Sequence, residues 1–135
     1  MTASITALRT DTGRTAIDRV DESTSHDGAA VTVVLHWDGA DHIGEVVGPP
    51  SAALRPLMVA RATLQALWSA GGREFEAIEA STTVTAGVVV AVVAVADPLL
   101  TTPIIGTAVM PDDNAQLGFA RATLDAINRR IDSHR

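Results

Sequence analysis

The sequence contains one eight-residue pattern twice. Ala-Arg-Ala-Thr-Leu-x-Ala followed by an aliphatic residue covers 60–67 and recurs 60 residues later, at 120–127. Each copy follows β-branched stretches, the second of which ends in Ile-Gly, at 43–44 and 105–106. A unit repeated within a short chain usually buries its apolar face against its twin. The duplication therefore predicts one domain made of two similar halves.

Composition fits a single domain with an aliphatic core. The 135 residues are 47% hydrophobic but only 3% aromatic, so Val, Leu, Ile and Ala must build the interior. The absence of cysteine excludes disulfides, thiolate nucleophiles and cysteine metal sites. All ten basic residues are arginine, which excludes a lysine Schiff base and a phosphate loop of the G-x-x-x-x-G-K type. The net charge of −6, without a cationic cluster, argues against a nucleic-acid partner.

No segment of the sequence predicts export or membrane insertion. The start, 1–27, lacks a basic region followed by an apolar core, so it does not read as a signal peptide. The longest apolar run, 86–96, has eleven residues, whereas a membrane helix needs about 20. Its valines favour a buried strand. We therefore expect a cytoplasmic protein with no membrane partner.

The first half predicts strands followed by a helix. We expect a poorly ordered segment at 1–27 containing one edge strand near 17–20. A strand at 29–37, the hairpin dipeptide Asp38-Gly39 and a return strand at 42–47 come next. Two prolines end that strand, and the regular part of the following helix begins near Arg55 because Pro56 belongs in a first turn. Its apolar stripe is Leu57, Ala60, Leu64 and Leu67, and Gly71-Gly72 ends it.

The second half repeats this order. Strands are expected at 74–83, 88–95 and 102–109, with a turn at Asp97-Pro98. Asp112-Asp113 then starts a helix by placing negative charge at its positive end. The stripe Leu117, Ala120, Leu124 and Ile127 follows that of the first helix at a constant offset of 60. We expect an α+β fold of two βββα units, 28–72 and 73–135, with a mostly antiparallel sheet and both helices on one face.

The polar clusters do not assemble a catalytic set. His36, Asp38, Asp41 and His42 surround one turn and could offer ligands to a divalent metal, but Asp and Gly at a hairpin tip are explained by the turn itself. The pairs Asp21-Glu22 and Asp112-Asp113 are explained by a solvated segment and by a helix start. No G-x-S-x-G elbow is present. We therefore expect no enzyme activity, no metal site and no cofactor.

Arg61 and Arg121 occupy the same place in the two copies of the repeat. Two interpretations stay open. The pair could line a symmetric anion pocket, or each arginine could extend its stem over the edge of the core and leave its charge in water. Trp37 and Trp68 are the two tryptophans, and we expect both to be packing anchors, with an interface role as the alternative.

Motifs around the strand-to-helix junctions point to a family. Residues 44–52 keep the outer glycines, the proline and the alanine of a G-x-G-x-G-P-x-x-A pattern, and 112–114 with 126–129 match an acidic helix start and a closing A-x-N-R. Through these, residues 29–130 resemble the C-terminal regulatory domain of 2-isopropylmalate synthase and citramalate synthase, the allosteric dimerisation domain. The family's middle glycine and following asparagine are Val46 and Val47 here, and its acidic residue is Ser51.

The resemblance implies two βββα units and a homodimer that binds an amino or keto acid. The family's catalytic barrel does not fit in 135 residues, so we expect a free-standing, non-catalytic regulatory module. Backbone N–H groups at both helix starts would face a carboxylate. The expected ligand-binding residues are Gly48, Pro49, Ser51, Ala52, Asp112, Asp113 and Asn114. The alternatives are an accessory or assembly subunit that docks on a partner protein and a small enzyme that uses the 36–42 turn.

Overall fold

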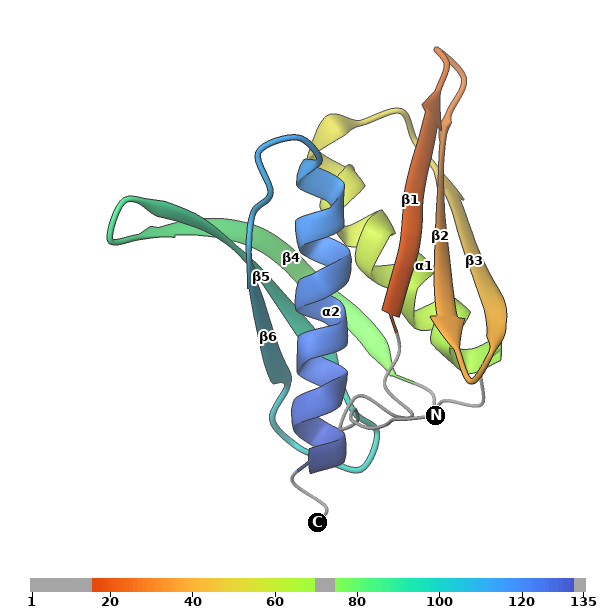
Figure 1. The fold of residues 1–135 in the computed structure, drawn as a ribbon. Helices are drawn as coiled ribbons and strands as arrows, with labels where there is room; N and C mark the ends of the chain where they lie inside the picture. The colour runs from red at the N-terminus through yellow and green to blue at the C-terminus, as the bar shows by residue number, and fades with distance from the viewer. Residues whose placement is uncertain (1–15, 70–74, 133–135) are drawn as a thin grey trace.

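A computed structural model describes residues 16–69 and 75–132 (Figure 1). It confirms an α+β fold of two βββα units. The first unit consists of β1 (Ala16–Thr24), β2 (Ala29–Trp37), β3 (Ala40–Gly48), a short 3-10 helix (Ala52–Leu54) and α1 (Arg55–Ser69). The second consists of β4 (Glu76–Thr85), β5 (Val88–Ala96), β6 (Ile104–Val109) and α2 (Ala115–Asp132).

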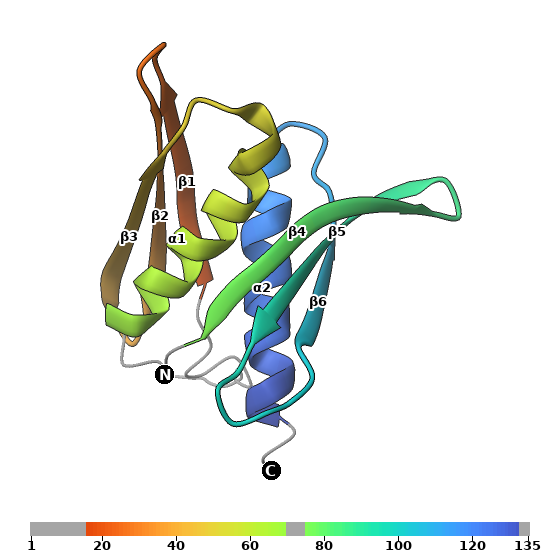
Figure 2. The same cartoon turned by 180° about the vertical axis from the view of Figure 1, so that it is seen from behind.

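The strands form two separate sheets where we expected one. Their orders are β1-β2-β3 and β4-β5-β6, and every neighbouring pair is antiparallel. Each helix packs on its own sheet, on the other helix and on the first strand of the other unit, so that α1 contacts β4 and α2 contacts β1. The helices therefore lie between the two sheets (Figures 1 and 2). These reciprocal contacts are those of an approximate two-fold relation between the units.

The strands of the two units correspond to each other as clearly as the helices do. In both units the first strand has a register irregularity at the same place, between Ile17 and Arg19 in β1 and between Ala77 and Glu79 in β4. The expected edge strand near 17–20 is β1, and it is longer than the expected one. Because β1 pairs with β2, the first unit begins before residue 28, inside the segment that we expected to be poorly ordered.

Helix and sheet approach each other most closely at one glycine in each unit. A Cβ added to Gly44 would lie 2.0 Å from the carbonyl oxygen of Ala62, and one added to Gly106 would lie 2.0 Å from that of Ala122. Small residues on the strand and on the facing turn of the helix let the two backbones meet. The fully buried alanines on these helix faces are Ala60, Ala62, Ala66, Ala120, Ala122 and Ala126.

The two helices begin differently. Helix α1 starts at Arg55, as expected. Helix α2 starts at Ala115, three residues later than expected, because the Asn114 side-chain oxygen accepts the Leu117 N–H at 3.2 Å and so caps the helix. Asp112 and Asp113 therefore precede its first turn, and the expected terminator Gly71-Gly72 lies outside the described residues. None of the helices in the described ranges is long and apolar enough to cross a membrane.

Tight turns close one hairpin in each unit. Asp38-Gly39, predicted as a turn, joins β2 to β3 with φ of 54° and 78°. Ala86-Gly87 joins β4 to β5 with φ of 53° and 77°. Two consecutive positive φ values define the turn type that favours Asn or Asp before Gly, so alanine at position 86 holds a conformation that suits it poorly.

We expect Ala86→Asn to stabilise the protein by about 0.5–1 kcal/mol, because asparagine tolerates the left-handed region better than alanine. Urea unfolding would measure the gain. The reciprocal change Asp38→Ala, at the equivalent place in the other turn, should destabilise by a similar amount. Equal midpoints for Ala86→Asn and the parent protein would contradict the prediction.

Candidate functional site

Two grooves lie where the helix of one unit meets the first strand of the other. The β1–α2 groove has a volume of about 930 Å³, and the β4–α1 groove one of about 610 Å³. Arg121 and Leu124 line the first, and their repeat equivalents Arg61 and Leu64 line the second. The duplication has therefore made two related grooves, each with one arginine of the repeated pattern on its wall.

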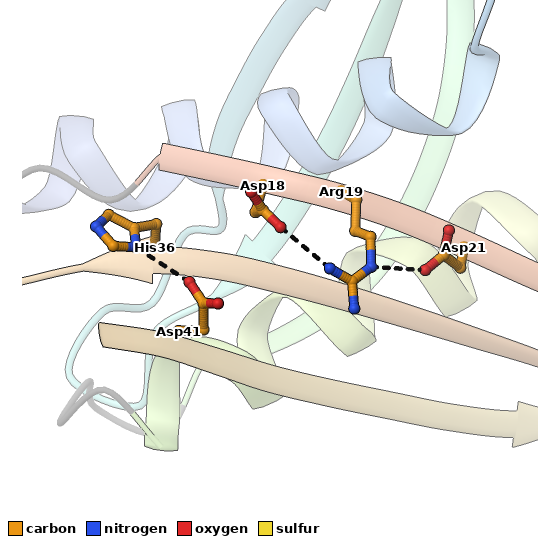
Figure 3. A network of polar contacts seen from close by, with 5 residues as sticks. All are labelled: Asp18, Arg19, Asp21, His36 and Asp41. Carbon is orange, nitrogen blue, oxygen red and sulfur yellow. Dashed lines mark hydrogen bonds and ion pairs between the residues drawn. The ribbon is translucent and has the colours of Figure 1, made fainter. Parts of the chain in front are cut away.

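Ion pairs neutralise one arginine of the β1–α2 groove. Arg19 Nε lies 3.0 Å from Asp21 Oδ2, and Arg19 Nη1 lies 3.2 Å from Asp18 Oδ2 (Figure 3). Arg121 is exposed and takes part in none of the ion pairs found among the described residues. The side-chain amides of Asn114 and Asn128 line the same groove. Within the described ranges, one guanidinium without an ion pair and two amides, one of which uses its oxygen to cap α2, are thus available to a ligand.

The β4–α1 groove combines charge of both signs with aromatic surface. Arg61 supplies the guanidinium and Glu76 supplies a carboxylate, and Asp97 also lines the groove. Asp97 is only 3% exposed, and its Oδ1 accepts the Leu99 N–H at 2.9 Å, which fixes the turn after β5. Trp68 is 40% exposed and lines the groove with Phe75. This arrangement suits a small zwitterion with an apolar side chain.

The strand-to-helix junctions of both units lie at the same end of the molecule, at the top of Figure 1. At the second junction Asn114 lines the β1–α2 groove, whereas Asp112 and Asp113 are exposed and are not among its lining residues. At the first junction the four expected residues line neither groove, and the Ser51 side chain makes no capping hydrogen bond. These four are Gly48, Pro49, Ser51 and Ala52. Of the expected ligand-binding residues, the structure brings Asn114 into a groove.

Arg55 at the start of α1 is a polar anchor that sequence reasoning missed. Its side chain is 8% exposed, and its Nη1 donates to Glu22 Oε1 at 2.7 Å and to Thr24 Oγ1 at 3.1 Å. A cation at the positive end of a helix is unfavourable unless an anion compensates it. The pair therefore ties the far end of the β1–β2 hairpin to α1. The sequence did contain a signal for this anchor: Arg55 lies in the first turn of α1, and no acidic residue in that turn compensates its charge.

The 36–42 turn does not bring its two imidazoles together. His36 pairs with Asp41 across the hairpin and its Nδ1 lies 3.0 Å from Asp41 Oδ1 (Figure 3). His42 pairs with buried Leu35, so it lies on the opposite face, where its ring centroid is 6.0 Å from that of Trp37. In the described ranges no three His, Cys, Asp or Glu side chains are grouped as metal ligands would be.

Arg61 and Arg121 line separate grooves and do not share one pocket. Both are exposed, so each guanidinium is open to water and to a ligand. Comparison with known proteins assigns no family, since neither a family model nor a curated protein matches this sequence. What the grooves can bind therefore has to be inferred from their own side chains.

Proposed function

We propose that this chain is a non-catalytic, dimerising regulatory module that binds a small amino or keto acid in its two grooves. The observation that carries the proposal is the repeated arginine, Arg61 on one groove wall and Arg121 on the other, each beside an apolar leucine. A planar guanidinium binds a carboxylate through two parallel hydrogen bonds, which gives both orientation and affinity.

The two grooves offer different partners to the rest of the ligand. In the β4–α1 groove, Glu76 suits an ammonium group, and Trp68 suits an aliphatic side chain. In the β1–α2 groove, the amides of Asn114 and Asn128 can donate to a keto oxygen. The β4–α1 groove therefore favours an amino acid and the β1–α2 groove favours a keto acid.

Titration calorimetry with branched-chain amino acids and their keto acids tests the proposal. We expect Arg61→Gln to weaken amino-acid binding about tenfold or more, because it removes the charge-assisted contact to the carboxylate. Arg121→Gln should weaken keto-acid binding in the same way. Arg129→Gln is the matched control, since Arg129 is exposed, lines neither groove and bonds Asp125 on its own helix. Absence of binding heat at millimolar ligand would exclude the metabolite-binding role.

A second candidate function is an accessory or assembly subunit that docks on a partner protein. The observation that favours it is the apolar outer face of the β4-β5-β6 sheet, on which Ile105 is 48% and Val109 is 62% exposed. Purification from the native host distinguishes the two functions. A stoichiometric protein partner would favour docking, whereas a dimer that retains a metabolite would favour sensing.

A further inference from the structure

The face of the β4-β5-β6 sheet that points away from the helices is apolar. Along β5, the side chains of Ala91, Val93 and Val95 are buried against the helices, so the alternate residues point outward. With their partners on β6 they form what we call the valine face, made of Val88, Val90, Val92, Ala94, Ile105 and Val109. The outward residues Ser81, Thr83 and Thr85 of β4 extend it without charge. Its charges are Glu79 and, at the edge where β4 also borders the β4–α1 groove, Glu76, both at the end of β4 far from the turn.

The equivalent face of the other sheet is mixed, because charged side chains stand on it together with exposed Ile43 and Val47. Arg19, Asp21, His36 and Asp41 stand there, joined by the contacts drawn in Figure 3, and Thr32 bonds Glu45. The outer face of the first sheet thus combines charged pairs with exposed aliphatic residues, whereas the outer face of β5 and β6 is aliphatic except for Thr107. An exposed polar face is normal for an antiparallel sheet, whereas a continuous apolar face marks an interaction site.

The β4–β5 hairpin adds an uncovered arm to this face. Every residue from 82 to 89 is exposed, and the hairpin extends beyond both helices in Figures 1 and 2. Val84 and Val89 pair across the strands on the side opposite the valine face, and they are 67% and 44% exposed. An isolated two-stranded ribbon with apolar side chains on both faces is marginal in water.

The first unit shows what is absent from this arm. At the end of its first hairpin, Glu22 and Thr24 bond Arg55 at the start of α1. Sixty residues later the equivalent positions are Thr82, Val84 and Ala115, which can form no such anchor. The second hairpin has thus lost its tether to the helix and gained apolar surface at the same positions.

We propose that the valine face and the arm at 82–89 form the interface with a second copy of this chain. A two-fold contact sets a patch against itself, so an uncharged patch meets its copy without like-charge repulsion even in a protein of net charge −6. The three strands have ten, nine and six residues and cover roughly 400 Å² in plan, and the second side of the arm adds to this. This plan area is about half of the roughly 800 Å² that each partner buries in a stable interface, so the second side of the arm has to contribute to the contact. The inference rests on the dimerisation included in the proposed function, and it names the surface through which the chain would dimerise.

Sedimentation velocity over the micromolar range, on the full chain, tests the interface. We expect the parent protein to be a dimer and Ile105→Glu/Val109→Glu to raise the dimer dissociation constant about thirtyfold or more, because it places two carboxylates in an apolar contact. The matched control is Ile43→Glu/Val47→Glu, at the equivalent positions of the other sheet, where Ile43 is 58% and Val47 is 73% exposed. This control should remain dimeric. Circular dichroism must show both double variants folded, and Thr107→Arg on the same face is the replacement should the first not fold.

Each outcome decides a separate point. Dissociation in the β6 variant alone supports the interface. A dimer that persists in the β6 variant overturns the interface and leaves dimerisation standing. A monomeric parent protein overturns both the interface and dimerisation, including dimerisation through the β1-β2-β3 sheet. Ligand binding is measured independently by calorimetry, so a variant that is monomeric but binds a metabolite separates failure of the interface from failure of the metabolite-binding role.

Discussion

Replacing Gly44 with alanine should cost about 3 kcal/mol or more of folding free energy. The new Cβ would lie 2.0 Å from the Ala62 carbonyl oxygen and 2.7 Å from the Ala66 nitrogen. Both are helix backbone atoms, so no side-chain rotamer change relieves the overlap, and α1 must move away from its sheet. Overpacking in a rigid core costs about 1–3 kcal/mol or more, and a small domain has only about 5–15 kcal/mol in total.

The duplication supplies a replicate of this experiment. Gly106→Ala places its Cβ 2.0 Å from the Ala122 carbonyl oxygen, so it should cost a similar amount, and the two changes together should abolish the cooperative unfolding transition. Thermal and urea unfolding followed by circular dichroism would measure both.

Gly48→Ala is the matched control because Gly48 lies on the same strand and the same face as Gly44. Its nearest neighbours would be side-chain atoms of Met58 at 3.5 Å, an ordinary contact. It should change stability by no more than about 0.5 kcal/mol. If Gly44→Ala proved as mild as Gly48→Ala, the close approach of α1 to β3 would be wrong.

The duplicated architecture was predictable from the sequence because its determinants are local and repeated. The stripes around Ala60 and Ala120 fix two helices, and the dipeptide Asp38-Gly39 fixes a turn. The division of the strands into two sheets was not predictable from the sequence, since it depends on which strand edges lie side by side after the helices have packed. Side chains from the helices cover part of those edges: the Glu45 N–H donates to Gln65 Oε1, and the Thr107 N–H donates to Asp125 Oδ2.

The candidate site was predictable only in part, for a related reason. The equivalence of Arg61 and Arg121 is visible in the repeat, but the grooves they line are formed by the other unit's first strand. Helix-start patterns placed ligand contacts at 48–52 and 112–114, and of these Asn114 reaches a groove. Contacts between units depend on the relative placement of two packed layers, which no local motif encodes.

Removing the carboxylate that compensates Arg55 is the second large effect we expect. Glu22→Gln leaves a guanidinium that is 8% exposed with the Thr24 hydroxyl as its remaining described partner, and its Nε is already buried without a hydrogen bond. Breaking a fully buried ion pair costs about 3–5 kcal/mol. Because the Glu22 side chain is 32% exposed, water can enter and reduce the loss to about 1–3 kcal/mol.

A double-mutant cycle shows whether that loss comes from the uncompensated charge. Asp21→Asn, next to Glu22 but exposed on the outer face, should cost no more than about 0.5 kcal/mol. Adding Arg55→Met to Glu22→Gln should recover most of the stability, because an apolar side chain of similar length needs no counter-ion. Urea unfolding of the four proteins in the cycle gives the coupling energy. A coupling energy near zero would mean that packing alone holds the β1–β2 hairpin to α1. The lack of this ion pair in the second unit would then be no argument that a second copy of the chain covers the β4–β5 arm.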